Sequence, residues 1–230
     1  MSELRVLECD NHVLVVDKPA CEPVVADESG DPSLHERARG WVEQEFDKPG
    51  RAFLGVVHRL DRPVSGVVLF ARTSKAAARL TDAFRERRVE KRYLALVEGL
   101  PQSGPRGVLE QWLRKDPRTR TVRVTHPEEE GSKRARTRYR LLEESERGAL
   151  LELRPETGRS HQLRVACASL GCPILGDLRY GASSALADRS VALHAASLEL
   201  EHPVRREPRT WSAPPPATEW WRAGARSLFE

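Results

Sequence analysis

A short charged stretch, VVHRLDRPVSGVVLFA at residues 56–71, separates two runs of aliphatic residues. Asp61 lies within it, beside Arg59 and Arg62, on a loop that leaves an apolar strand. A neighbouring cation keeps a carboxylate ionised at neutral pH, and an ionised carboxylate can act as a base or as a nucleophile toward an electrophilic carbon. A loop aspartate can also form an ordinary salt bridge, and the spacing alone favours that plainer interpretation.

Two other segments carry polar groups that could take part in chemistry. Tyr93 follows RRVEKR and opens the apolar run YLALV, where an isolated tyrosine is typically a core aromatic with its hydroxyl at the rim. Residues 156–164, ETGRSHQLR, present Arg159 and Arg164 from the start of a helix and from its second turn. Such arginines can bind a carboxylate or phosphate with two hydrogen bonds, or simply line a helix surface.

Arginine also recurs at every second position of SKRARTRYR, residues 132–140. On a strand this spacing places four guanidinium groups on one face, those of Arg134, Arg136, Arg138 and Arg140. The face is either simply solvated or a phosphate-binding surface, because arginine clusters neutralise a nucleic-acid backbone. The net charge of only +4 does not separate these two interpretations.

Several common kinds of site have no support in the sequence. Walker-type and dinucleotide-binding glycine patterns and the G-x-S-x-G elbow are absent. The histidines at 58, 161 and 194 lack metal-ligand spacing, and the four cysteines form no C-x-x-C pair, so neither a metal site nor a disulfide framework is implied, which fits a reducing cytoplasm. No apolar run approaches the roughly 20 residues of a membrane span, and the first residues lack a signal-peptide core. We therefore expect a cytoplasmic protein, with nothing that demands more than a monomer.

The elements that must position these groups follow from periodicity and turn signals. Val56–Val57 and Val67–Ala71 are expected to be strands buried on both faces. Helices are predicted from Ser33, with Glu36 completing a capping box, from Ser74 to about Arg87, over 160–170 and at about 218–229. Further strands are predicted at 12–17, 91–98, 107–113, 119–125, 135–142, 149–154 and 191–200. The predicted fold class is α+β, with a mixed, mostly antiparallel sheet and a few flanking helices.

Several of these segments together resemble one family, the RluA-type RNA pseudouridine synthases. HRLDRPVSG resembles that family's pattern of His-Arg-Leu-Asp followed by Thr-Ser-Gly. The similarity extends to NHVLVVDKPA (11–20), EKRYLALVEG (90–99), LRPETGRSHQLRVACASLGCPILGDLRYG (153–181) and LHAASLELEHP (193–203). These segments stand in the family's order and span nearly all of residues 11–203, so a chance match is excluded.

The resemblance implies a pseudouridine synthase catalytic fold that isomerises uridine within ribosomal or transfer RNA, without metal or organic cofactor. Asp61 matches the nucleophilic aspartate, which is proposed to attack C1′ of the ribose or C6 of the base. Tyr93 matches the tyrosine that stacks on the uracil, and Arg164 the arginine that pairs with the aspartate. Arg59 matches the arginine that holds the everted nucleotide, and we place Leu163 with it at the substrate. We assign contacts with the RNA stem-loop to six further arginines: Arg62, Arg134, Arg136, Arg138, Arg140 and Arg159.

The sequence departs from the family pattern in two respects. Val64 stands where the family usually has threonine, which predicts weaker ordering of the loop rather than loss of chemistry. Only about ten residues precede the first matching motif, so we expect residues 1–230 to form a single catalytic domain without the N-terminal S4-type RNA-binding domain of many relatives.

Two other functional classes are compatible with the same residues. A non-catalytic RNA-binding protein would keep the fold but would not need Asp61, Tyr93 and Arg164 together. A hydrolase acting on sugars would need a second positioned carboxylic acid beside Asp61, and the sequence offers no convincing candidate.

Overall fold

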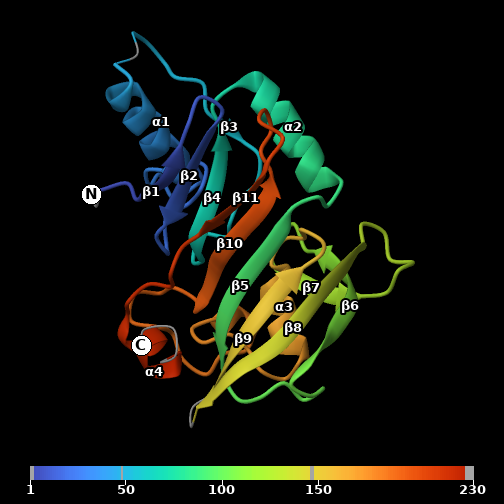
Figure 1. Ribbon diagram of the computed structural model, residues 1–230. Coiled ribbons are helices and arrows are strands. Elements are labelled where there is room, and N and C mark those ends of the chain that lie inside the picture. The colour runs from blue at the N-terminus through green and yellow to red at the C-terminus, as the bar shows by residue number, and fades with distance from the viewer. Residues whose placement is uncertain (1–2, 48, 146–147, 226–230) are drawn as a thin grey trace. The chain divides into compact units, whose positions relative to one another are not determined.

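The computed structural model describes residues 3–47, 49–145 and 148–225 (Figure 1). These residues form two compact units, the first within residues 1–90 and 195–214 and the second within 91–194 and 215–230. Antiparallel strands with accompanying helices make up each unit, which confirms the predicted α+β class. Two such units can be parts of one catalytic domain, so the single-domain assignment stays a prediction.

The first unit is built on strands in the order β1-β2-β4-β10-β11, with β3 paired to β4. The β1–β2, β2–β4, β3–β4 and β10–β11 pairs are antiparallel. Its elements are β1 (Val6–Cys9), β2 (Val13–Lys18), α1 (Leu34–Glu45), β3 (Gly55–Val56), β4 (Ser65–Ala71), α2 (Ser74–Arg85), β10 (Leu193–Glu201, from Ala195 onward) and β11 (Pro208–Ser212).

The core of this unit follows from its continuous apolar runs. Every residue of β2 and β4 is buried, and α2 packs Leu80 and its small alanines against Val15, Leu69 and Trp211. Val56 and Val57 differ from expectation, because they are only partly buried and β3 is a two-residue strand. β11 was not predicted, since Trp211 is its only buried side chain and a proline opens it, as suits an edge strand.

The helices of the first unit begin at capped residues. Ser33 caps α1, and its side chain and that of Glu36 complete the predicted capping box with each other's backbone N–H. The predicted N-cap of the second helix was Ser74, but Ser74 is the first residue of α2. Thr73 is the N-cap, and its hydroxyl accepts a hydrogen bond from the N–H of Ala76 at 3.2 Å. α2 ends at Arg85, two residues before the predicted end.

The second unit carries an antiparallel sheet in the order β5-β9-β8-β6-β7. α3 packs on this sheet through Val165, which joins a core of Leu113, Val122 and Ala135. The elements are β5 (Glu90–Val97, from Lys91 onward), β6 (Arg106–Lys115), β7 (Val122–Thr125), β8 (Lys133–Ser145), β9 (Gly148–Pro155), α3 (Gln162–Ser169), the 3₁₀ helix η1 (Leu178–Tyr180) and α4 (Glu219–Gly224).

Three boundaries in this unit differ from the prediction, two of them for local reasons. β7 begins at Val122 rather than 119, because the Asp116 carboxylate accepts from the N–H of Arg118 at 2.8 Å and holds residues 116–121 in a turn. α3 begins at Gln162 rather than 160, because His161 has a left-handed backbone (φ +50°). α4 ends at Gly224, and the rest of its predicted range, from residue 226, lies outside the described residues.

Candidate functional site

In the first unit, Asp61 lies on a turn between β3 and β4. The N–H of Val64 donates to the carbonyl oxygen of Asp61 at 3.0 Å and closes the turn. Leu60 and Val64 are buried on either side, whereas Asp61 is only partly buried. The apolar neighbours anchor the turn and leave a carboxylate at its tip, and a buried Val64 shows that an apolar side chain fills the position where threonine was expected.

The surroundings of Gly66 explain why the HRLDRPVSG segment ends in a glycine. Its backbone has φ +116°, and a Cβ there would lie 2.3 Å from the carbonyl oxygen of Ala195. Any larger residue would push β4 away from β10, because the three nearest atoms are all backbone atoms of Ala195. The close approach of the two strands therefore fixes the position of the chain five residues after Asp61.

Lys18 anchors the same turn from the other side, and sequence reasoning missed it. Its side chain is fully buried, and Nζ donates to the carbonyl oxygens of Pro19 (2.8 Å), Glu22 (2.6 Å) and Arg62 (3.1 Å). Burial lowers the pKa of Lys18 to about 8, while nearby acidic groups, including the Asp61 carboxylate, act in the opposite direction. The available signal in the sequence was a lysine at the end of a strand that begins with four aliphatic residues, VLVVDK.

The other polar residues of the segment have distinct environments. Nε2 of His58 accepts from the N–H of Leu69 at 2.9 Å, and the ring stacks on Phe84, so this histidine supports β4. Arg62 donates to the carbonyl oxygen of Cys21 and pairs with two carboxylates, those of Asp27 and Asp31. Arg59 is exposed. Its proposed contact with a nucleotide and the RNA contact of Arg62 stay predictions.

In the second unit, Tyr93 lies on the sheet face that α3 covers. Tyr93 is opposite Leu153 on β9, and Leu153 is opposite Tyr139 on β8, so the three side chains share a face. Tyr93 is only partly buried, unlike the fully buried Leu153. Partial exposure of this tyrosine is compatible with a stacking role.

Arg164 is buried on α3 and forms a two-bond ion pair with Asp177. Nε donates to Oδ2 at 2.7 Å and Nη2 to Oδ1 at 2.6 Å, while the guanidinium lies 5.0 Å from the ring centre of Tyr180. A guanidinium has five N–H donors, so this pair engages two of them. Pairing of Arg164 with Asp61, which belongs to the first unit, stays a prediction, as does the substrate contact of Leu163, a buried neighbour on α3.

Gln162 organises the loop before α3 and was also missed. Its buried amide makes four hydrogen bonds: Oε1 accepts from Oγ1 of Thr157 (2.7 Å) and the N–H of Arg159 (3.0 Å), and Nε2 donates to the carbonyl oxygen of Arg136 (3.0 Å) and Oγ1 of Thr137 (2.9 Å). All the hydrogen-bonding capacity of a primary amide is thus used. The loop is held rigidly against β8.

The four alternating arginines share one exposed face of β8, as predicted, and it is the face opposite Tyr93. Between them lie Ala135, Thr137 and Tyr139, which are buried. Each arginine has a carboxylate partner: Glu110 pairs with Arg134 and Arg136, Glu156 with Arg136 and Arg138, and Glu152 with Arg140. We call this set the arginine face. Its carboxylate partners come from β6, from β9 and from the residue directly after β9, which the sequence pattern of β8 could not indicate.

Two other kinds of site are absent from the described residues. Within residues 3–47, 49–145 and 148–225, no group of three or more histidine, cysteine or acidic side chains is arranged to hold a metal ion. In the same residues no helix has the length and apolar character needed to cross a membrane.

Comparison with known proteins gives consistent matches. A family model described as RNA pseudouridylate synthase matches residues 12–169. A "Ribosomal large subunit pseudouridine synthase D" of Xanthomonas campestris is 38% identical over 93% of this chain, and a relative of the same name from Nitrosomonas europaea is 35% identical. The chain spans only 66% and 62% of the length of these two relatives. An uncharacterized RNA pseudouridine synthase of Zymomonas mobilis is 37% identical, with 92% of this chain and 94% of the relative covered.

Solved structures agree with the sequence matches. The structure titled "Human RNA Pseudouridylate Synthase Domain Containing 1" has a TM-score of 0.75 and 30% identity, covering 94% of this chain and 85% of that one. "Human RNA Pseudouridylate Synthase Domain Containing 4" has a TM-score of 0.76 over 93% of this chain and 89% of the other. Its 24% identity supports the fold alone.

Proposed function

The chain belongs to the RNA pseudouridylate synthase family, and on that premise we propose that it isomerises uridine within an RNA chain to pseudouridine, with Asp61 as the nucleophile. The observation that carries the proposal is the turn at Asp61. It presents a partly exposed carboxylate between two fixed points, the Lys18 ammonium bonded to the Arg62 carbonyl and the contact of Gly66 with β10. Such rigid placement is what a nucleophile requires.

The proposed reaction balances within the nucleotide itself. The Asp61 carboxylate adds to C1′ of the ribose or to C6 of the uracil, and the N1–C1′ bond breaks. The base turns, a C5–C1′ bond forms, and the bond between the Asp61 carboxylate and the nucleotide breaks, which returns the free carboxylate. The proton on C5 is removed and N1 gains a proton. The product is an isomer of the substrate, so the reaction needs no oxidant or other co-reactant.

The target base must leave its stack before Asp61 can reach it, at a cost of a few kcal/mol. We propose that Tyr93 stacks on the extruded uracil and that Arg59 and Leu163 hold the nucleotide. Arg164 is proposed to orient Asp61. The partial exposure of Tyr93 and the rigid, doubly bonded guanidinium of Arg164 support these roles. Assignment of RNA contacts to Arg62, Arg159 and the arginine face stays a prediction.

For the substrate we propose RNA of the large ribosomal subunit, supported by the names of the two D-type relatives. Pseudouridine should be mapped in total RNA from cells with and without this gene. The proposal predicts loss of pseudouridine at one or more positions of large-subunit RNA.

Loss of pseudouridine only from transfer RNA would contradict the proposed ribosomal substrate, but it would still support the proposed isomerase activity. The non-catalytic alternative would be supported instead if no RNA lost pseudouridine while the purified protein bound structured RNA.

A further inference from the structure

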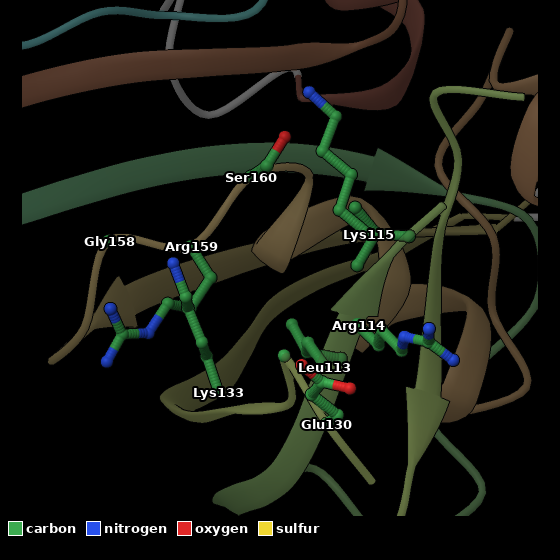
Figure 2. A pocket seen from close by; sticks show the side chains of 10 residues that line it. Leu113, Arg114, Lys115, Glu130, Lys133, Gly158, Arg159 and Ser160 are labelled. Atoms are coloured by element: carbon green, nitrogen blue, oxygen red, sulfur yellow. The ribbon is translucent and has the colours of Figure 1, made fainter. Parts of the chain in front are cut away.

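A pocket of about 530 Å³ lies in the second unit, where β6 and β8 meet the loop before α3 (Figure 2). Its size is within the range of pockets that hold small ligands. Five charged side chains line it, four cations and one anion: Arg114, Lys115, Lys133, Arg159 and Glu130. The excess of positive charge predicts an anionic ligand.

The pocket opens on the face of the sheet that carries α3 and Tyr93. Lys115 alternates with the buried Leu113 on β6, and Lys133 precedes the buried Ala135 by two residues on β8. Leu113 and Ala135 both pack with Val165 of α3. Because side chains two residues apart share a face, both lysines lie on the α3 side, opposite the arginine face.

Lys115 and Lys133 differ from Arg114 in whether a carboxylate of the protein pairs with them. Within the described part of the chain, the ion pairs include neither Lys115 nor Lys133, and both side chains are exposed. Arg114, by contrast, pairs with Glu129, which also binds Arg123. A ligand phosphate would therefore compete with a protein carboxylate for Arg114 but not for the two lysines.

One wall of the pocket is already ordered. Gly158, Arg159 and Ser160 form that wall, and the four hydrogen bonds of Gln162 hold the loop to β8. Nε of Arg159 donates to the carbonyl oxygen of Arg134 at 3.0 Å, which fixes the base of its side chain at the rim. A preformed wall lowers the entropy cost of binding.

We infer that this pocket binds the phosphodiester backbone of substrate RNA next to the target uridine, an inference that rests on the proposed function. Lys115, Lys133 and Arg159 contact phosphates. Glu130 would repel a phosphate, but it can accept a hydrogen bond from a ribose 2′-hydroxyl, the group that distinguishes RNA from DNA. A strand bound there stays on the face that carries Tyr93.

The test is the salt dependence of binding to a fluorescein-labelled, single-stranded 20-nucleotide RNA of mixed sequence. Each phosphate contact contributes about 0.7 to the slope of log Kd against log salt for a single strand. The K115S/K133S double variant is expected to bind about tenfold more weakly at 50 mM KCl and to lower that slope by about 1.4. The matched control K75S/R85S removes the same charge from the exposed surface of α2 and should leave both quantities unchanged.

Lysine acetylation provides a second readout that needs no substitution. In the wild-type protein, the same RNA should protect Lys115 and Lys133 from sulfo-NHS-acetate, but not Lys75, as measured by mass spectrometry. An unchanged slope in K115S/K133S, or lysines that the RNA leaves unprotected, would overturn the inference.

Pseudouridine formation is measured in parallel on large-subunit RNA transcripts. Suppose that the salt slope falls in K115S/K133S but the wild-type protein forms no pseudouridine. That result would refute the proposed function and leave the pocket assignment standing. Product from wild type with an unchanged slope in K115S/K133S would refute the pocket assignment alone.

Discussion

The second unit pairs arginine with carboxylate in two contrasting ways. Arg164 and Asp177 are 7% and 1% exposed and meet through two aligned hydrogen bonds. On the arginine face, Arg138 and Arg140 are 63% and 59% exposed, and single carboxylates are shared among several guanidinium groups. Water screens the second arrangement and not the first.

The contrast shows that a conspicuous sequence pattern need not mark the strongest interaction. Four arginines at alternate positions are obvious in the sequence, yet exposed ion pairs contribute little to stability. Arg164 and Asp177 are thirteen residues apart and unremarkable individually. Removing one member of a buried pair leaves an uncompensated charge, at a cost of about 3–5 kcal/mol.

The largest effect is expected for Asp177→Asn. This variant leaves the buried Arg164 without its carboxylate, so the free energy of unfolding, measured with urea, should fall by about 3–5 kcal/mol. Glu156→Gln, which removes a more exposed carboxylate bonded to two arginines, is the matched control and should cost far less. Equal losses in the two variants would show that burial does not separate the two arrangements.

Lys18 extends the comparison to a buried cation held by carbonyl oxygens, and its effect depends on pH. Its pKa is about 8 in the folded protein and 10.5 in an unfolded chain, so between these values the unfolded state binds more protons. Lys18 should therefore raise the free energy of unfolding by about 3 kcal/mol as the pH increases from 8 to 10.5, a gain lost again as the pH falls through 8.

The measurement is urea unfolding at several pH values, for wild type and for Lys18→Met, which cannot titrate. The difference between the two proteins isolates Lys18 from the other groups that titrate in this range. Parallel curves from pH 8 to 10.5 would refute the shifted pKa.

Glu152 lies between the two extremes. Its carboxylate is only 7% exposed, but its three partners, Arg92, Arg140 and Arg154, are far more accessible. Glu152→Gln is expected to cost about 1–3 kcal/mol, as for the loss of hydrogen bonds to a charged group. A cost as large as that of Asp177→Asn would mean that burial of the carboxylate alone decides the effect.

The smallest effect is expected on the arginine face itself. R138S/R140S should leave the free energy of unfolding within measurement error, because both side chains are exposed and share their carboxylates. Its RNA salt slope should also change less than that of K115S/K133S. A larger change in R138S/R140S would place the backbone contact on the arginine face, as the alternating sequence pattern first indicated.

Local sequence signals predicted much of the fold. The capping box at Ser33 and Glu36, the buried runs of β2 and β4, and the alternation on β8 each depend on neighbours within a few residues. The missed features depend on partners far along the chain. The ammonium of Lys18 binds the carbonyl of Arg62, and Gly66 faces Ala195, so neither role is visible before the strands are paired.

The candidate site follows the same division. Asp61, Tyr93 and Arg164 were identified through motifs rather than geometry, and their roles stay proposals. Gln162 was overlooked although it lies inside ETGRSHQLR, because its four partners include residues of β8. Asp177 was overlooked because a buried ion pair requires knowledge of how α3 and η1 pack.

The central claim is that Asp61 is the nucleophile of an RNA uridine isomerase. The most direct measurement is single-turnover pseudouridine formation on the large-subunit RNA segment identified by mapping, for wild type, Asp61→Asn and the surface control Asp82→Asn. We predict product from wild type and Asp82→Asn and none from Asp61→Asn, which should still fold and bind the RNA. Pseudouridine formed by Asp61→Asn at the wild-type rate would contradict the account.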